Sequence, residues 1–179
     1  MTVGVLALQG AFGLHVDLLE SLGVRAVEVR RADQLDSVDR LVLPGGGATT
    51  VSMLAARFDL LEPLRAFCRS GRPVFGTCAG AILLGSEILD GRADQHCLGA
   101  VDISVRRNGF GRQVDSFEID VDIDALAAAG LGDAPFHAVC IRAPVIERVG
   151  DGVEVMARID GSPALVRDGA IMVAIFHPE

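Results

Sequence analysis

The sequence predicts an α/β fold of three layers, with a mainly parallel central sheet and an antiparallel extension. In the first half of the chain, short apolar runs alternate with helical patterns, which favours parallel strands joined by right-handed crossovers. Beyond residue 97 almost every segment has the pattern of a strand, and several alternate polar and apolar residues. The 179 residues are 50% hydrophobic, so we expect one domain, residues 1–179, with a full core.

The elements of the first half are expected to form β-α-β units. Gly23 and Gly71 follow helical patterns and are typical stop signals, and Pro63 predicts a break or a new start within its helix. The expected strands are residues 3–8, 24–29, 41–44 and 73–75, and the expected helices are 12–22, 49–70 and 79–88. The first of these helices is indicated by Leu14, Leu18, Leu19 and Leu22. In the second half, strands are expected at residues 101–105, 114–121, 136–141, 153–159, 164–167 and 171–176, with a helix at 124–129.

Composition and charge exclude several classes of protein. The net charge of −8 argues against non-specific binding of nucleic acid, which needs a basic surface. The apolar runs are shorter than the ~20 residues of a membrane-spanning helix, and no secretory signal opens the chain. The four cysteines form no CxxC pair and no zinc-type spacing with histidine, so neither a disulfide framework nor a metal site is expected. We therefore expect an acidic cytoplasmic protein that contacts neither nucleic acid nor membrane.

Cys78 is the candidate nucleophile. It stands in the run Gly-Thr-Cys-Ala-Gly at residues 76–80, between an expected strand and an expected helix. Such a G-x-nucleophile-x-G turn is strained, and its glycines remove Cβ atoms that would clash there. The N-terminus of the following helix would lower the pKa of the thiol and offer N–H groups to an oxyanion. The alternative is a buried cysteine in a glycine-rich turn, which is how we interpret the other three cysteines.

His177 is the candidate base. It follows the strand expected at residues 171–176, and Pro178 and Glu179 come after it. In an extended chain residues 177 and 179 project to the same side, so the glutamate could accept the Nδ1–H of the imidazole and fix its tautomer. A polar C-terminal tail is the alternative. A solvent-facing or otherwise satisfied histidine explains each of the remaining three, His15, His96 and His137.

Further motifs accompany this pair along almost the whole chain. They are residues 4–11 with His15, 43–46 (LPGG), Thr49-Thr50, 75–80 (FGTCAG), 107–118 (RNGFGRQVDSFE), 141–144 (IRAP) and 176–179 (FHPE). Together they resemble the class I, triad-type glutamine amidotransferases. The block at residues 107–118 is not shared by glutaminase domains in general, so the closest resemblance is to one branch, the glutaminase subunits of pyridoxal 5′-phosphate synthase.

The resemblance implies that the chain hydrolyses L-glutamine to L-glutamate and ammonia through a cysteinyl thioester, without cofactor or metal. It implies a triad of Cys78, His177 and Glu179, and an oxyanion hole formed by the N–H groups of Gly46 and Ala79. The glutamine-binding residues that it implies are Gly46, Gly47, Ala48, Arg107, Ile141 and Arg142. The alternative for the two arginines is a surface ion pair, which contributes only ~0–1 kcal/mol.

A partner is implied as well, because ammonia released to neutral water would be protonated and lost. In the family that this sequence resembles, the partner is a TIM-barrel synthase subunit, and the two form a large hetero-oligomer. Gln9 resembles the family residue that senses docking. The acidic surface would suit a basic partner face.

Two departures from the family pattern leave alternatives open. The family pattern Pro-Gly-Gly-Glu-Ser-Thr-Thr corresponds to residues 44–50 of this chain, where Gly47 and Ala48 replace the glutamate and the serine. These replacements remove a carboxylate and a hydroxyl near the expected substrate. The family also continues into a C-terminal helix, and an end at Glu179 would add a terminal carboxylate to the triad itself. The alternatives are therefore a catalytically weakened or silent regulatory subunit, and the glutaminase of another amidotransferase such as imidazole glycerol phosphate synthase.

Overall fold

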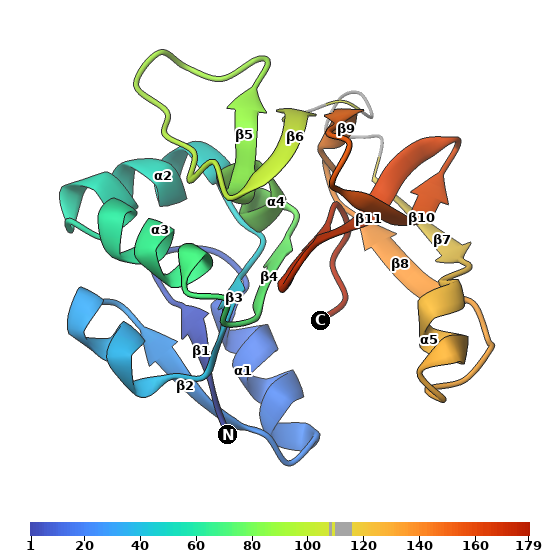
Figure 1. Ribbon diagram of the computed structural model, residues 1–179, viewed down its shortest axis with the longest axis horizontal. Helices are drawn as coiled ribbons and strands as arrows, with labels where there is room; N and C mark the ends of the chain where they lie inside the picture. The colour runs from blue at the N-terminus through green and yellow to red at the C-terminus, as the bar shows by residue number, and fades with distance from the viewer. Residues whose placement is uncertain (108, 110–115) are drawn as a thin grey trace.

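The computed structural model describes residues 1–107, 109 and 116–179 (Figure 1). Within them, the largest sheet has seven strands, and five of these run parallel. Its strands in spatial order are β10 (Glu154–Ile159), β11 (Ser162–Asp168), β12 (Ile171–Ala174), β4 (Val74–Thr77), β3 (Arg40–Leu43), β1 (Thr2–Leu6) and β2 (Arg25–Val29). Because β10 and β11 are antiparallel and lie at one edge, the sheet matches the mainly parallel arrangement with an antiparallel extension that the sequence predicts.

Helices cover both faces of this sheet and complete three layers (Figure 1). The helices are α1 (Phe12–Ser21), α2 (Ala48–Arg57), α3 (Leu61–Arg69), α4 (Ala79–Leu84) and α5 (Asp124–Ala128), with a 3-10 helix η1 at Ala32–Ser37. In β3, Val42 packs on the face covered by α1, whereas Leu41 and Leu43 pack on the face covered by α2 and α3. Alternate residues of a strand point to opposite faces, so one apolar strand serves both cores.

Two smaller sheets belong to the second half of the chain. One has β5 (Gly85–Ile88), β6 (Val101–Arg106) and β9 (Val145–Val149), and the other is an antiparallel pair of β7 (Phe117–Val121) and β8 (Phe136–Cys140). Their buried residues, such as Ile103, Ile146 and Ala138, belong to the same continuous hydrophobic core as the buried residues of α2 and α3. In the described part of the chain, no helix is long and apolar enough to cross a membrane.

Several expected elements differ from the structure. The helix expected at residues 79–88 ends at Leu84, because the chain extends at Gly85 and pairs with β6 as β5. The helix expected at 49–70 is two helices, and Pro63 lies in the first turn of α3, where a missing N–H costs nothing. Strand β9 was not predicted. Of the strand expected at 114–121, residues 114 and 115 lie outside the described residues.

The leucines that indicate α1 do not define its buried face. Leu14, Leu18 and Leu22 are exposed, whereas His15 is buried on the side that carries Phe12 and Leu19. The sequence therefore predicts the helix correctly, but of its four leucines only Leu19 lies on the packed face.

The close packing of α4 on β3 gives a test of the fold. A Cβ at Gly80 would overlap the Leu43 carbonyl oxygen, which is backbone and cannot move aside. We expect Gly80→Ala to lower the free energy of unfolding by ~3 kcal/mol or more. The matched control is Gly13→Ala in α1, where the new methyl group meets nothing within 4 Å, and which should stabilise the protein by up to ~1 kcal/mol. Urea denaturation measures both, and a neutral Gly80→Ala would contradict the packing.

Candidate active site

Cys78 lies at a sharp turn between β4 and α4. Its φ of 48° and ψ of −99° form a strained conformation of the kind that collects at functional sites. The turn depends on two glycines, since a Cβ at Gly76 would strike the Leu84 side chain and one at Gly80 would overlap the β3 backbone. This is the strand-to-helix elbow that the sequence predicts.

Two backbone hydrogen bonds bring Cys78 and His177 together from distant parts of the chain. The Cys78 N–H donates to the Ala174 carbonyl at 2.9 Å, where β4 and β12 run in parallel. Three residues beyond Ala174, the His177 N–H donates to the Val139 carbonyl of β8 at 2.9 Å. Gly45 packs so closely against the imidazole that a Cβ there would overlap the ring.

His177 and Glu179 form the pair that their spacing predicts. The Nδ1 atom of His177 lies 2.8 Å from Oε1 of Glu179, whose side chain is 1% exposed. Hydrogen bonds with Cys78 and with Glu179 raise the pKa of His177 to about 10, although burial acts in the opposite direction. Because Nδ1 faces the carboxylate, Nε2 is left for the sulfur, as in a nucleophile, base and carboxylate triad.

A second histidine contacts the same carboxylate. His15 is buried, and its Nε2 atom lies 3.2 Å from Glu179 Oε2 and 3.2 Å from Thr77 Oγ1. The sequence alone favours a solvent-facing or satisfied histidine here and does not connect it with the triad. The available signal is its place on the helical face of Phe12 and Leu19, which predicts burial but not its partners.

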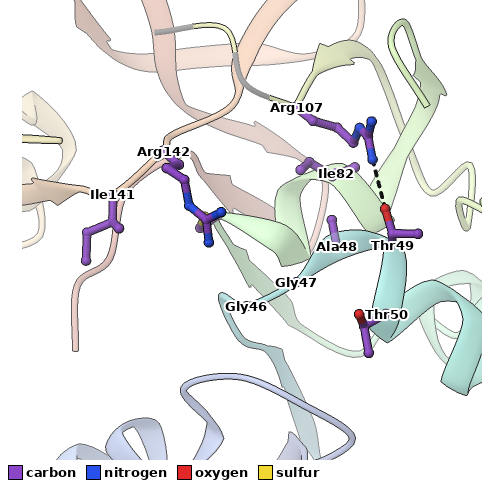
Figure 2. Close-up of a pocket in the computed structure, with 10 residues that line it drawn as sticks. Gly46, Gly47, Ala48, Thr49, Thr50, Ile82, Arg107, Ile141 and Arg142 are labelled. Atoms are coloured by element: carbon purple, nitrogen blue, oxygen red, sulfur yellow. Dashed lines mark hydrogen bonds between the residues drawn. The ribbon is translucent and has the colours of Figure 1, made fainter. Parts of the chain in front are cut away.

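Cys78 lines a cavity of about 150 Å³, whose other lining residues are labelled in Figure 2. Its lining contains every residue that the sequence analysis assigns to glutamine binding: Gly46, Gly47, Ala48, Arg107, Ile141 and Arg142. Thr49, Thr50 and Ile82 complete the lining together with the cysteine. The cavity lies at the start of α2, and Figure 2 shows Arg107 and Arg142 on different sides of it. The six expected residues come from three separate segments of the chain, 46–48, 107 and 141–142, which only the fold brings together.

Arg107 is held by a network of hydrogen bonds. Its Nη1 donates to Thr49 Oγ1 at 2.8 Å (Figure 2) and to Gln95 Oε1 at 3.2 Å. Its Nη2 donates to the Asp90 carbonyl at 2.7 Å. Asp90 also accepts the Arg107 N–H through its carboxylate at 2.8 Å. The roles of Gln95 and Asp90 were not predicted, because both stand in a polar loop without a motif. The network fixes the guanidinium at the cavity wall.

The glycine loop at residues 45–47 is tied to Gln9. Gln9 Oε1 accepts the Gly47 N–H at 2.6 Å, so this N–H is already engaged. The Gly46 N–H donates no hydrogen bond within the described residues. Ala79 is the first residue of α4, and its N–H therefore has no partner one turn earlier in the helix. The N–H groups of Gly46 and Ala79, which the sequence analysis expects at an oxyanion, are thus not engaged in the hydrogen bonds described here.

The structure therefore brings together the residues that the sequence singles out. Cys78, His177 and Glu179 are in contact, the six residues expected to bind glutamine line one cavity, and Gln9 touches the glycine loop. His137 is instead exposed on β8, beside Asp120 and Glu118. Of the block at residues 107–118, positions 108 and 110–115 lie outside the described residues.

Comparison with known proteins agrees with the class that this fold and site define. The SNO glutamine amidotransferase family matches residues 5–179, and the chain belongs to this family. A crystal structure of a glutamine amidotransferase superposes with a TM-score of 0.89 at 45% identity, covering 98% of this chain and 89% of the other. A second solved structure, a GMP synthase candidate from Thermoplasma acidophilum, shares the fold at 19% identity and a TM-score of 0.69, with 99% of this chain and 84% of the other covered.

Curated relatives narrow the comparison to one branch of the family. The pyridoxal 5′-phosphate synthase subunit PdxT of Frankia alni is 54% identical over 177 residues, which cover 99% of this chain and 86% of that protein. PdxT of Herpetosiphon aurantiacus is 52% identical and covers 100% of this chain and 93% of its own. PdxT of Mycobacteroides abscessus is 54% identical, and the match covers 99% of this chain and 89% of that protein.

The raised pKa of His177 can be measured directly. With a pKa of about 10 the imidazole is protonated at pH 8. We expect Cys78→Ala to lower this pKa toward 6.5, because the largest cause of the rise is lost while the Glu179 hydrogen bond remains. NMR titration of histidine ¹⁵N shifts is the measurement. His137 is the internal control, since Asp120 and Glu118 raise its pKa independently of the cysteine. An unchanged midpoint for His177 would contradict the contact with the sulfur.

Proposed function

We propose that this chain is the glutaminase subunit of a pyridoxal 5′-phosphate synthase and hydrolyses L-glutamine to L-glutamate and ammonia. The observation that carries the proposal is the contact series of Cys78, His177 and Glu179 at a cavity of about 150 Å³. The relatives at 52–54% identity are named subunits of this synthase, which supports the choice of branch. The proposal treats residues 1–179 as one glutaminase domain.

In the proposed reaction, the Cys78 thiolate attacks the side-chain amide carbon of glutamine. A C–S bond forms, and the carbonyl π electrons move to oxygen as an oxyanion. As the oxyanion collapses, the C–N bond breaks and the His177 imidazolium gives its proton to the leaving nitrogen, so ammonia departs and a thioester remains. Water then attacks the thioester while His177 takes its proton, and glutamate leaves with regeneration of the cysteine. Glu179 holds the imidazole through Nδ1 in both halves.

The oxyanion is proposed to accept hydrogen bonds from the N–H groups of Gly46 and Ala79. Gly46 lines the cavity that Cys78 also lines, and Ala79 follows Cys78 in the chain at the start of α4. Losing one donor of this kind typically raises the barrier by ~2.7–4 kcal/mol. Gly47 is not proposed as a donor, because its N–H is bound to Gln9.

For substrate binding, the two arginines are proposed to face the carboxylate end of glutamine. Arg107 is oriented by Thr49 and Gln95 before any ligand arrives, which lowers the entropy cost of binding. Arg142 and Ile141 belong to the opposite wall, and Gly46, Gly47 and Ala48 contribute backbone contacts.

The ammonia is proposed to pass to a synthase subunit of TIM-barrel fold, in a large hetero-oligomer. Gln9 is proposed to sense docking, since its side chain holds the glycine loop that borders the oxyanion site. The cytoplasmic location expected from the sequence remains part of the proposal.

The alternatives differ in what supports them. A silent regulatory subunit is favoured by Gly47 and Ala48 alone, whereas the assembled triad and cavity favour an active enzyme. The glutaminase of imidazole glycerol phosphate synthase is not favoured, because the curated relatives named above are all pyridoxal 5′-phosphate synthase subunits.

The nucleophile is tested by Cys78→Ala. Glutamate release from glutamine, measured in the presence of the synthase subunit, should fall by at least about a thousandfold, because no other group forms the thioester. Cys97→Ser is the matched control, since this cysteine lies away from the cavity and contacts the Ser86 carbonyl, and it should retain activity. Circular dichroism should show both variants folded, and undiminished hydrolysis by Cys78→Ala would refute the assignment.

The glycine loop is tested by Gly47→Glu. A Cβ at this position would lie 3.2 Å from Gln9 Oε1, the end of a flexible side chain that can move. We expect a lower KM for glutamine and little change in kcat, because the carboxylate restores a partner for the substrate's ammonium group. Gly47→Gln has the same length without the charge and should not lower KM. An unchanged KM in Gly47→Glu would count against the role of this loop.

A further inference from the structure

The carboxylate of Glu179 faces two imidazoles rather than one. Its Oε1 accepts from His177 at 2.8 Å, and its Oε2 lies 3.2 Å from Nε2 of His15 on α1. The same Nε2 is 3.2 Å from Oγ1 of Thr77, the residue that precedes the nucleophile. His15 is 4% exposed and Thr77 is fully buried. Nε2 of His15 is therefore adjacent both to Glu179 and to Thr77, the neighbour of Cys78 in the chain.

The second carboxylate oxygen needs such a neighbour. Glu179 Oε2 is buried and accepts no hydrogen bond of standard geometry within the described residues. Removing a carboxylate oxygen from water is costly unless an opposite charge or dipole compensates it. Only the tautomer of His15 that carries its proton on Nε2 presents a positive dipole to Oε2. In the other tautomer a lone pair would face the carboxylate.

We propose that His15 is a positioning residue of the triad, which holds Glu179 through Oε2 so that Oε1 stays on His177. The proposal rests on the proposed glutaminase function. His15 does not touch the reacting atoms; it acts by preventing rotation of the carboxylate away from Nδ1 of His177. Thr77 Oγ1, on the same nitrogen, fixes this imidazole relative to the elbow.

The charges around the pair agree with this role. Burial lowers the pKa of His15, Glu179 raises it and His177 lowers it, and the net direction is downward, so the imidazole is neutral at pH 7. Burial raises the pKa of Glu179, but the hydrogen bond from His177 and the His15 imidazole oppose it and keep this pKa below its ordinary value. Cys78 affects these groups through His177, whose pKa it raises by a hydrogen bond. Without His15 the pKa of Glu179 therefore rises.

A simpler interpretation is a buried histidine that only satisfies Thr77. In that case a substitution would change stability without a specific effect on catalysis. Two variants of equal length separate the interpretations: glutamine keeps an N–H donor near the position of Nε2, and methionine has none.

The experiment compares His15→Gln with His15→Met in the complex with the synthase subunit. We expect His15→Met to lower kcat for glutamine hydrolysis ten- to a hundredfold, roughly the loss typical when a residue that orients a functional side chain is removed. KM should stay within about twofold, since binding groups are untouched. The acid limb of the pH profile should move to higher pH, because Glu179 then protonates more easily. His15→Gln should recover most of kcat, and the exposed His137→Gln should match the wild type.

Other outcomes would overturn the proposal. These are a wild-type kcat in folded His15→Met, an equal loss in His15→Gln and His15→Met, or a change in KM alone. An inactive wild-type complex would instead contradict the proposed function, and Cys78→Ala serves as its reference.

One measurement needs neither activity nor a variant. In the wild-type protein at pH 7, histidine ¹⁵N shifts should show His15 neutral with its proton on Nε2. A proton on Nδ1 would refute the contact with Glu179, even if His15→Met does not fold.

Discussion

The parallel pairing of β4 with β12 is the constraint on which the site depends. It aligns Thr77 with Ala174, so Cys78 and His177, the proposed nucleophile and base, follow neighbouring strands at the same edge of the sheet. Ligands of open α/β sheets bind at this carboxyl edge, because strand ends, loops and helix N-termini meet there. The backbone hydrogen bond from Cys78 to Ala174 then fixes the distance between the turn after β4 and the end of β12. The bridge between His177 and Val139 fixes the direction of the chain after β12.

Close backbone contacts around this edge explain why glycine recurs there. Gly45 lies against the His177 ring, Gly10 against the Gly45 carbonyl, and Gly80 against the end of β3. Each contact replaces a side chain with backbone, so strand ends approach more closely than ordinary residues allow. As a result, the imidazole of His177 packs against the backbone of Gly45 in addition to its hydrogen bond with Glu179, which suits a group proposed to keep its orientation.

Local patterns predict what is locally determined, and long-range pairing decides the rest. The elbow and the His177–Glu179 pair follow from short spacing and backbone geometry, so the sequence predicts both. For residues 85–88 the sequence predicts helix instead of strand, because their extended state depends on pairing with β6. The contact of His15 with Glu179 could not be predicted, because the two residues are far apart in the sequence and meet only once the whole sheet has formed.

The two changes in the glycine loop alter how the cavity can recognise its substrate. At Gly47 and Ala48, where α2 starts, the cavity wall offers backbone and a methyl group in place of a carboxylate and a hydroxyl. In the proposed reaction, charge recognition then falls mainly on Arg107 and Arg142. Because Arg107 is already bound to Thr49, Gln95 and Asp90, ordering it costs little when the ligand enters. The arginines thus serve the carboxylate end of the proposed substrate, whereas Gly47 and Ala48 offer its ammonium group no carboxylate or hydroxyl side chain.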